Sequence, residues 1–417
     1  MIVQKGKYTT AKIMIDSVDE SCMSQINDFI NHPAFTNPVS IMPDTHAGKG
    51  SVIGFTMPLS NKVIPNVIGV DIGCGMHSIN IGSYLHLSWD KLDYKIRRNI
   101  PFGNEVHDNA IINFKNDFPW HKVNVLAEKF AAAYKTEFNY IIKPPRYTND
   151  WFIEKSQKIG GNIRRYINSI GTLGGGNHFI ETGISDKGDY WITVHSGSRN
   201  FGKRICEYWQ NRAIKIIKKI KDINTRGLEW LEGEIAAQYL FDMVFSQIYA
   251  RVNRSYIINT ICSILKLEPL ESIETVHNFI DFNDFIIRKG AIRSYKDERI
   301  IIPFNMRDGL LICQGKSNPE WNYSAPHGAG RVMSRAQAKK NLDVEIFKKQ
   351  MKGIYSTSVG SGTLDESPDS YKDVSVIKEA IKDTVDIISH VKPLHNMKDA
   401  TQNRHKIKKN RKKNGFS

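Results

Sequence analysis

The sequence has few cysteines and no long apolar segment. Five cysteines occur in 417 residues, and they are odd in number and scattered along the chain. This argues against a disulfide framework of the kind that holds small secreted domains together. No run of roughly 18 or more apolar residues is present, which argues against a membrane-spanning helix, and the first residues lack the pattern of a secretory signal. We therefore expect a reduced, soluble, cytoplasmic protein that has no membrane contact.

Acidic residues are also in short supply. The chain has 43 Asp and Glu against 58 Lys and Arg, a formal net charge of +15. Seven of the positive charges, and no acid, fall in residues 404–417, so the rest of the chain keeps +8. A charge block without apolar periodicity is typical of a solvated, disordered tail, and it also suits an arm that binds phosphates. Both interpretations stay open, and the basic body favours a polyanionic partner.

Hydrophobic periodicity predicts one large α/β domain. Short β-branched runs bounded by Gly and Pro are typical of buried strands, and they occur at 39–43, 51–57, 63–72, 170–181, 190–202, 298–316 and 324–335. Helical periodicity covers 203–223, 228–265 (two helices, or one kinked near Gly233), 343–353 and 372–391. Because strand regions recur between helices without a linker, we expect a single domain over residues 1–400, with peripheral helices at 104–169 and a basic tail at 401–417.

Two residues after a β-branched run are candidate metal ligands. Asp71 and Cys74 stand three apart in VDIGCGMH, and the flanking glycines allow a turn tight enough for both side chains to meet one ion. His178, His195 and His277 lie in similar strand-to-loop contexts. Together the five residues are enough for two adjacent divalent ions that share one ligand. A donor set of imidazole, carboxylate and one sulfur suits Mn, Fe, Co or Zn.

Two glycine-rich loops supply a second feature. LGGGNHF at 173–179 and SAPHGAGR at 324–331 can present backbone N–H groups to an anion such as phosphate. Arg199 and Arg331 follow in positions suited to neutralise phosphate charge. A histidine in such a loop, here His327, is a candidate metal ligand, general acid or nucleophile towards phosphorus. Taken singly, such loops are more often simple tight turns.

Read in order, these blocks resemble one known family. PDTHAGKG, VIGVDIGCGM, GTLGGGNHFIE, VHSGSRNFG, HN and SAPHGAGRVMSR run from residue 43 to 335 in the order seen in the RtcB family of RNA-splicing ligases. The resemblance implies an α/β fold with a β-sheet core and a central two-metal cleft. It also implies GTP- and Mn²⁺-dependent joining of an RNA 3′-phosphate or 2′,3′-cyclic phosphate to a 5′-hydroxyl, through a His–GMP intermediate and a GMP-activated RNA end.

The resemblance also implies roles for individual residues. It makes Asp71, Cys74, His178, His195 and His277 the ligands of two Mn²⁺ ions, with Cys74 bridging them. It makes His327 the nucleophile that accepts GMP and Arg199 a further catalytic residue. The expected GTP or phosphate contacts, besides His327, are Asn177, Glu181, Gly328, Ala329, Gly330 and Lys398. RNA and GTP are thus the expected partners, and a monomer is compatible with the sequence.

The sequence departs from the family pattern in two places. The loop at 303–309, PFNMRDG, differs from the smaller, Ser-containing loop of the family, and the basic extension follows Lys398-Asp399. PDTHAGKG and APHGAGR, together with NMRDG in this loop, resemble a shorter bacterial or phage branch, for which we expect RNA repair or tRNA splicing. The alternatives are a cyclic phosphodiesterase that never ligates, an enzyme that caps 3′ ends with GMP without sealing, and an RNA-binding relative without catalysis. A hydrolase has no need of a phosphate-accepting histidine, so His327 separates the first of these from a ligase.

Overall fold

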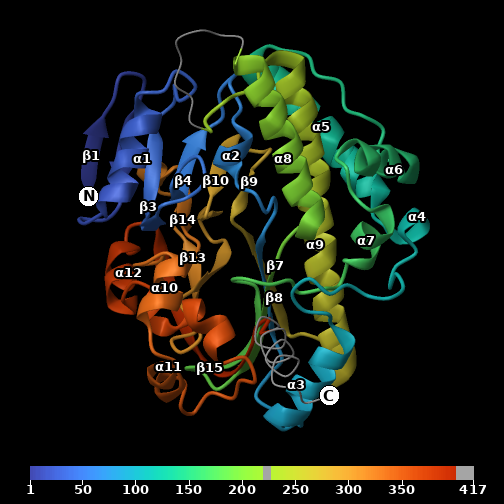
Figure 1. Cartoon of the computed structure of the whole chain (residues 1–417), viewed down its shortest axis with the longest axis vertical. Coiled ribbons are helices and arrows are strands. Elements are labelled where there is room, and N and C mark those ends of the chain that lie inside the picture. Colours follow the sequence, from blue (N-terminus) through green and yellow to red (C-terminus); the bar gives the residue numbers. More distant parts are fainter. Residues whose placement is uncertain (219–226, 401–417) are drawn as a thin grey trace, which may run out of the picture.

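A computed structural model describes residues 1–218 and 227–400 and contains two larger β-sheets and a two-stranded ribbon (Figure 1). The seven-stranded sheet consists, in spatial order, of β12 (Arg299–Pro303), β13 (Leu310–Gly315), β15 (Val385–Met397), β6 (Phe179–Ser185), β7 (Tyr190–Ser196), β5 (Gly75–Asn80) and β8 (Glu271–Val276). All six of its strand pairs are antiparallel. Strands from four distant parts of the sequence therefore become neighbours.

The other sheets bring the N-terminal region to the same centre. The six-stranded sheet has the order β1 (Ile2–Lys5), β2 (Thr10–Ile13), β3 (Val39–His46), β4 (Ile53–Pro58), β10 (Ile286–Lys289) and β9 (Asn278–Ile280). The ribbon pairs β11 (Ala291–Arg293) with β14 (Ser324–Pro326). β8 belongs to the seven-stranded sheet and β9, which follows it closely in the chain, to the six-stranded sheet. β11 of the ribbon in turn follows β10 of the six-stranded sheet. The short strands β9 and β11 therefore connect the sheets.

Helices cover the outer faces of the sheets. Two long helices, α8 (Arg199–Ile217) and α9 (Gly233–Leu265), run side by side along one flank (Figure 1). Outside them lie α4 (Phe114–Asp117), α5 (Trp120–Phe138), α6 (Asn149–Lys158) and α7 (Ile163–Asn168), all within residues 104–169. The remaining helices are α1 (Glu20–Ile30), α2 (Pro65–Ile68), α3 (Trp89–Asn99), α10 (Arg335–Asn341), α11 (Val344–Gln350) and α12 (Val374–Ala380), with short 3₁₀ turns at Pro319–Trp321, Ser361–Glu366 and Pro368–Ser370.

The α/β class is confirmed, and one predicted helix is wrong. The helix expected over 372–391 ends at Ala380, and the chain then enters the long strand β15. This strand pairs with β13 on one side and β6 on the other. The β-branched residues around Ile387 suit a strand, and pairing on both sides satisfies the backbone groups that a helix would have satisfied internally. Tertiary pairing has thus overridden the helical periodicity.

Four predicted strand regions are also partly wrong, and two of them, 190–202 and 324–335, are strand only at their start, in β7 and β14. Within 63–72 the chain forms the single-turn helix α2, which has Pro65 in its first turn and ends at Gly69 with φ 107°. Proline is well suited to a first helical turn because its missing N–H would have no intrahelical partner there. Within 170–181 only the last residues are a strand, because β6 begins at Phe179. The glycines before it include two with positive φ, Gly174 and Gly176, which interrupt any strand.

The helical predictions for the central part of the chain need smaller corrections. One helix, α9, begins at Gly233 and continues for 33 residues without a break. Residues 228–232 are not helical, and Leu231 pairs with Val63 instead. The end of the helix predicted over 203–223 lies outside the described residues, as does the predicted tail at 401–417. In the described part of the chain, no helix has the length and apolar character needed to span a membrane.

Candidate metal and nucleotide site

The five predicted metal ligands lie together at the ends of β5, β6, β7 and β8. Their donor atoms form two groups, Asp71–Cys74–His178 and Cys74–His195–His277, each with all donor atoms within 4.8 Å of one another. Cys74 Sγ is 3.5 Å from His178 Nε2 and 3.3 Å from His195 Nε2. His195 Nε2 is 3.2 Å from His277 Nε2. The thiol is therefore the one donor that belongs to both groups.

The glycines beside Cys74 explain why the chain can bring it there. Gly73 has φ 73°, and a Cβ on it would lie 2.9 Å from the backbone of α9 at Gln247. A Cβ on Gly75 would lie 2.2 Å from the Thr275 carbonyl oxygen of β8. Contacts this short are not possible for a real side chain, so only glycine fits at either position. The two glycines let the turn into β5 press against α9 and β8, and Cys74 is held between them.

Hydrogen bonds from the outer ring nitrogens orient two of the histidines. His178 Nδ1 lies 2.8 Å from the Leu173 carbonyl oxygen, and His195 Nδ1 lies 3.1 Å from the Asn177 carbonyl oxygen. A carbonyl oxygen can only accept, so each Nδ1 carries the proton and each Nε2 keeps its lone pair. Both Nε2 atoms face Cys74. This arrangement of ring nitrogens is typical of histidines that ligate a metal.

Burial keeps the imidazoles of His195 and His277 neutral. His195 and His277 are 5% and 3% exposed, and burial lowers the pKa of both rings well below the usual value. Burial also raises the pKa of the Cys74 thiol, and the nearby Asp71 carboxylate raises it further. Burial alone would raise the pKa of Asp71 as well, but the neighbouring His178 ring and the hydrogen bonds from Ser198 bring it below its usual value. Binding of a divalent cation would favour the thiolate form of Cys74, because a thiol that coordinates a metal ion is deprotonated.

The donor set fits divalent metal ions. Metal–nitrogen bonds of roughly 2.0–2.1 Å and metal–sulfur bonds of roughly 2.3 Å place the ligand atoms of a tetrahedral ion roughly 3.3–3.8 Å apart. Cys74 Sγ lies 3.5 and 3.3 Å from the Nε2 atoms of His178 and His195, and the Nε2 atoms of His195 and His277 lie 3.2 Å apart, which comes close to this spacing. His277 Nδ1 has no hydrogen-bond partner among the described residues. The cluster could therefore hold two ions, with His178 and Asp71 at one and His195 and His277 at the other.

His327 stands next to this cluster but belongs to another element. It follows β14, and its ring centroid is 4.8 Å from that of His277. The Asp44 carboxylate at the end of β3 is fully buried and accepts two hydrogen bonds from His327, one from Nδ1 at 2.6 Å and one from the backbone N–H at 3.2 Å. Because Nδ1 donates to Asp44, the Nε2 lone pair of a neutral ring is free. The ring is thus fixed in a form that can act as a nucleophile.

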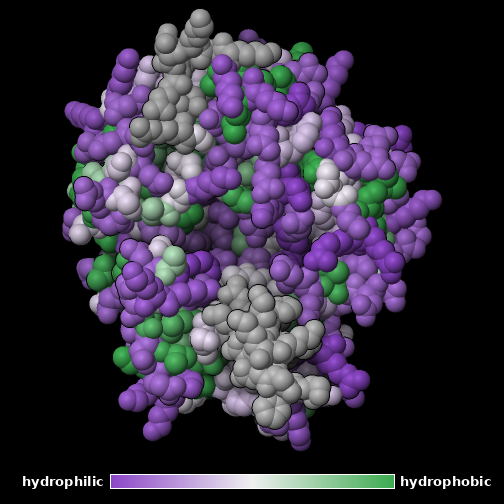
Figure 2. Space-filling model, in the orientation of Figure 1, coloured by the Kyte–Doolittle hydropathy of each residue, from purple (hydrophilic) through white to green (hydrophobic). Residues whose placement is uncertain are grey.

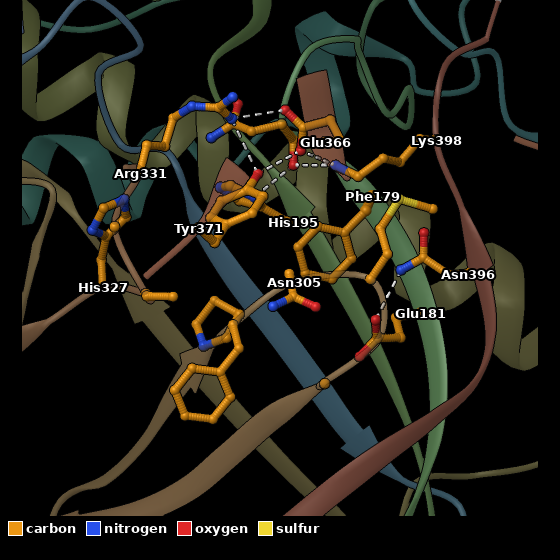
Figure 3. A pocket seen from close by; sticks show the side chains of 18 of the residues that line it. Phe179, Glu181, His195, Asn305, His327, Arg331, Glu366, Tyr371, Asn396 and Lys398 are labelled. Carbon is orange, nitrogen blue, oxygen red and sulfur yellow. Dashed lines mark hydrogen bonds and ion pairs between the residues drawn. The ribbon is translucent and has the colours of Figure 1, made fainter. Parts of the chain in front are cut away.

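A pocket opens beside His327 (Figure 3). It is lined by His46, Asn177, Phe179, Glu181, His195, residues 303–306, Gly309, residues 327–331, Arg335, Glu366, Tyr371, Asn396 and Lys398. The face of the molecule shown in Figure 2 is hollowed near its centre, and the surface around the hollow is largely hydrophilic. The predicted nucleotide contacts all line this pocket: Asn177, Glu181, Gly328, Ala329, Gly330 and Lys398. The loop at 303–309 forms one wall.

A buried ion-pair network lies at one end of the pocket. Lys398 Nζ is 2.8 Å from Glu366 Oε2 and also donates to the Asn177 carbonyl oxygen at 3.2 Å. Arg335 Nη1 lies 2.9 Å from Glu366 Oε1. Burial raises the pKa of Glu366, but Lys398 and Arg335 outweigh it, so the pKa of Glu366 lies below its usual value. The carboxylate is ionised, and it holds the lysine against the pocket wall.

Glu181 and Asn396 form a second polar pair, deeper in the same pocket (Figure 3). They are 4% and 1% exposed, and Asn396 Nδ2 donates to Glu181 Oε2 at 2.8 Å. Burial raises the pKa of Glu181 to about 8, although Asn396 and Lys398 act in the opposite direction. Asn396 Oδ1 is buried and has no hydrogen-bond partner in the described part of the chain.

The two predicted arginines lie differently from what the sequence indicated. Arg199 does not line the pocket; its Nε donates to Thr172 Oγ1 at 3.1 Å and its Nη2 to the Gly103 carbonyl oxygen at 2.8 Å. Arg331 does line the pocket, but its guanidinium donates to the carbonyl oxygens of Met333 and Asp365. Both arginines already bind their own chain through two nitrogens, so bidentate phosphate binding would require these bonds to be exchanged.

Several site residues had no assigned role in the sequence. Asp44 lies inside PDTHAGKG, one of the blocks that resemble the family, but its contact with His327 did not follow from this block. Glu366, Tyr371 and Asn396 come from segments without glycine-rich loops, and local pattern gave no signal for them. They reach the pocket only because β15 and the 3₁₀ turn before Ser367 fold back over it.

Comparison with known proteins gives a consistent result. The family model described as "tRNA-splicing ligase RtcB" matches residues 25–399. The "RNA-splicing ligase RtcB" of Escherichia coli (strain K12) is 29% identical over 396 residues, covering 89% of this chain and 92% of the relative. The "tRNA-splicing ligase RtcB" of Nanoarchaeum equitans is 25% identical over 434 residues and covers 89% of each chain. The matched region contains every residue of the metal cluster and the pocket.

Proposed function

The chain belongs to the RtcB family and is an RNA ligase, and from this premise we propose that it joins RNA 3′-phosphate or 2′,3′-cyclic phosphate ends to 5′-hydroxyl ends with GTP and two Mn²⁺ ions. The proposal assigns Asp71, Cys74, His178, His195 and His277 to the metal ions, with Cys74 shared. Bound divalent ions would stabilise negative charge on phosphoryl oxygens. The other catalytic roles belong to residues of the chain.

In the first step, His327 Nε2 attacks the α-phosphorus of GTP. A bond forms between Nε2 and phosphorus, the bond to the β-phosphate oxygen breaks, and pyrophosphate leaves. Asp44 keeps Nδ1 protonated and stabilises the positive charge that develops on the ring. The guanine moiety would occupy the pocket beside His327, where Glu181 and Lys398 lie.

In the second step, GMP passes from His327 to the RNA 3′-phosphate. This converts the 3′-phosphate into an activated end whose leaving group is GMP. The RNA 5′-hydroxyl then attacks the 3′-phosphorus, a phosphodiester forms and GMP leaves. A 2′,3′-cyclic phosphate must first be hydrolysed, because only a free 3′-phosphate can accept GMP.

One observation carries this proposal. His327 is fixed by a buried carboxylate with its reactive nitrogen free, and it stands 4.8 Å, ring to ring, from a ligand of the candidate metal cluster. A phosphodiesterase would require the metal cluster but does not need a histidine that accepts a phosphate. An RNA-binding relative without catalysis would require neither.

Covalent labelling tests the proposal. Incubation with α-labelled GTP and Mn²⁺ without RNA should give a protein-bound label that is stable in alkali and lost in acid, as expected for a phosphoramidate. The label should be absent from His327→Ala. A label retained in this variant would contradict the assignment of the nucleophile, and an enzyme that opens cyclic phosphate without taking up label would be the phosphodiesterase.

Ligation assays separate the remaining possibilities. Added RNA with 3′-phosphate and 5′-hydroxyl ends should be sealed; a capped but unsealed 3′ end would indicate the GMP-capping alternative. We further propose a role in repair of cleaved RNA in the cytoplasm, based on the short branch that the sequence resembles. Joining of exon halves but not of broken tRNA or ribosomal RNA would contradict that role.

A further inference from the structure

Two adjacent polar residues of α9, Asn253 and Arg254, are fully buried behind the candidate metal cluster. Both residues are 0% exposed, and they lie inside a helix that packs against β5 and β7. A buried amide and a buried guanidinium are costly unless their hydrogen bonds are made. The partners of these two side chains therefore show what the pair does in the fold.

Asn253 binds the segment that orients His178. Its Oδ1 atom accepts hydrogen bonds from the backbone N–H groups of residues 171–172, at 2.8 and 3.1 Å. The next residue, Leu173, supplies the carbonyl oxygen that lies 2.8 Å from His178 Nδ1. Asn253 Nδ2 donates to Ser196 Oγ at 3.0 Å, and this hydroxyl donates to the same Leu173 carbonyl oxygen at 2.7 Å. Asn253 thus fixes, from two sides, the carbonyl group that sets the tautomer and direction of the His178 ring.

Asn253 also binds the segment that orients Asp71. Its Nδ2 atom donates to the Gly197 carbonyl oxygen at 3.0 Å. The next residue, Ser198, donates to Asp71 Oδ1 from both its N–H and its hydroxyl, each at 3.0 Å. One asparagine therefore holds the hydrogen-bond partners of two ligands, Asp71 and His178, and both ligands belong to the same metal group.

Arg254 binds segments that carry the other metal group. Its Nη1 atom donates to the Gly73 carbonyl oxygen at 2.7 Å and to the Ser196 carbonyl oxygen at 3.0 Å. These carbonyl groups belong to the residue before Cys74 and to the residue after His195. The guanidinium therefore fixes the spacing between the segments that hold the shared thiol and one imidazole.

The same guanidinium reaches the strand of the third ligand. Arg254 Nε and Nη2 donate to Glu274 Oε1 at 3.2 and 2.9 Å, and Glu274 lies on β8, the strand that ends just before His277. Three nitrogens of one planar group thus bind three segments, and each segment carries a ligand of the group Cys74–His195–His277. A single ammonium has no such fork and cannot bind the three segments in these directions.

We propose that Asn253 and Arg254 are positioning residues that set the two metal groups separately, Asn253 the group that contains His178 and Arg254 the group that contains His277. The inference rests on the proposed function, because it assumes that both groups hold ions. It goes beyond that function because it assigns the geometry of each ion to a residue that is not a ligand. Replacement of such partners behind the ligands commonly changes metal affinity about 10- to 100-fold.

The test measures Mn²⁺ binding to Asn253→Leu, Arg254→Lys and the wild-type protein. Leucine has nearly the shape of asparagine without its hydrogen bonds, and lysine keeps the charge of arginine without its fork. Equilibrium dialysis without RNA or GTP gives the two dissociation constants independently of ligation. We expect each variant to bind one ion about tenfold more weakly, and the other nearly as the wild-type protein does.

Absorption of bound Co²⁺ identifies the ion that each variant keeps, because the spectrum depends on the ligand set. At one Co²⁺ per chain, Asn253→Leu should give the spectrum of His178→Ala, which lacks a ligand of the group that Asn253 holds. Arg254→Lys should give the spectrum of His277→Ala, which lacks a ligand of the group that Arg254 holds. Equal weakening of both ions, the reversed assignment, or constants equal to the wild-type values would overturn the proposal. A merely loosened core would act on both groups alike.

Matched controls replace similar side chains elsewhere. In Asn124→Leu, the replaced asparagine of α5 binds both the N–H and the carbonyl oxygen of Tyr147, each at 2.9 Å. In Arg288→Lys, the replaced arginine of β10 is 0% exposed and binds Asp284 and Ser324. Both controls should lower the melting temperature and leave both Mn²⁺ constants unchanged. A control that weakens Mn²⁺ binding as much as its counterpart would contradict the proposal.

Two milder variants leave α9 intact, so the test does not depend on the folding of the first pair. Ser198→Ala removes the hydroxyl that donates to a metal ligand, and it should weaken the ion that Asn253→Leu weakens. Glu274→Gln removes the anionic partner of Arg254, and it should weaken the ion that Arg254→Lys weakens. Unchanged constants in both would overturn the proposal. If the wild-type protein bound no Mn²⁺, the proposed function itself would fail, whereas two ions bound equally well by all variants would contradict only this inference.

Discussion

Replacement of Asp44 by Asn tests how His327 is activated. The carboxylate is fully buried, and one of its oxygens accepts from both Nδ1 and the backbone N–H of His327. Asparagine has the same shape but no charge. If its Oδ1 takes the place of that oxygen, the histidine keeps its tautomer but loses a charged partner. If the amide nitrogen takes that place, Nδ1 can no longer donate, and the proton moves to the nitrogen that should attack.

The structure sets the size of the effect. A hydrogen bond to a charged group contributes about 1.5–3 kcal/mol and one between neutral groups about 0.5–1.5 kcal/mol. The difference of about 1 to 1.5 kcal/mol corresponds to a roughly tenfold slower guanylylation. The wrong tautomer costs much more, up to roughly 10⁴-fold where a carboxylate orients a catalytic histidine. We therefore expect Asp44→Asn to slow guanylylation by a factor between about 10 and about 10⁴.

Rapid-quench, single-turnover labelling with α-labelled GTP measures this step without RNA. GTP affinity and Mn²⁺ stoichiometry should stay near those of the wild-type protein, because Asp44 belongs to neither proposed binding set. The matched control is Asp242→Asn, which alters a buried carboxylate on α9 that binds Lys155 and Trp209. It should lower stability and leave the rate constant unchanged. A rate constant for Asp44→Asn equal to that of the wild-type protein would refute the reasoning.

Two further predictions concern the metal cluster and a buried lysine. Cys74→Ser should reduce the number of bound Mn²⁺ ions below two per chain, as counted by atomic emission after gel filtration. The control Cys206→Ser alters a buried thiol of α8 and should keep both ions. Equal counts in the two variants would exclude a shared thiolate ligand. Burial lowers the pKa of Lys289 to about 7, and its amine donates to the carbonyl oxygens of Lys49 and Ser51. Between pH 7 and the usual pKa near 10.5 the unfolded chain binds a proton that the folded chain lacks, so the free energy of unfolding gains up to about 1.4 kcal/mol per pH unit from this group. Denaturant titrations should show a smaller slope with pH in Lys289→Met, and a slope like that of the wild-type protein would mean that Lys289 stays charged.

The five predicted ligands lie together in the structure, and each of them lies in a local pattern that limits its surroundings. Cys74 stands between glycines whose Cβ atoms would collide with α9 and β8, and His195 ends a β-branched run. Such positions are dictated by backbone geometry within a few residues. Which ligands share a metal depends on strand order, which was not predictable from periodicity. The antiparallel neighbours β5, β6 and β7 bring Cys74, His178 and His195 together.

The error at 372–391 has its origin in tertiary pairing. Residues 381–391 carry apolar residues at spacings that suit a helix as well as a strand, and only the presence of β13 and β6 on either side decides for a strand. Asn396 owes its place in the pocket to the same pairing. Its contact with Glu181 therefore could not follow from the sequence until β15 was known to be a strand that pairs with β6.

The proposed nucleophile, His327, and the candidate metal cluster come from different sheets, and their junction constrains both. The Gly290 N–H donates to the His277 carbonyl oxygen at 2.5 Å, and a Cβ on Gly290 would lie 2.2 Å from Ile53 of β4 and 3.3 Å from Cε1 of His327. With φ 62°, this glycine lets the chain cross from β10 to β11 while the last metal ligand and the nucleophile stay in contact. The distance between His277 and His327 is thus set by backbone packing around a residue without a side chain. Chemistry that requires a phosphorus atom to meet both groups depends on this junction as directly as on the histidines themselves.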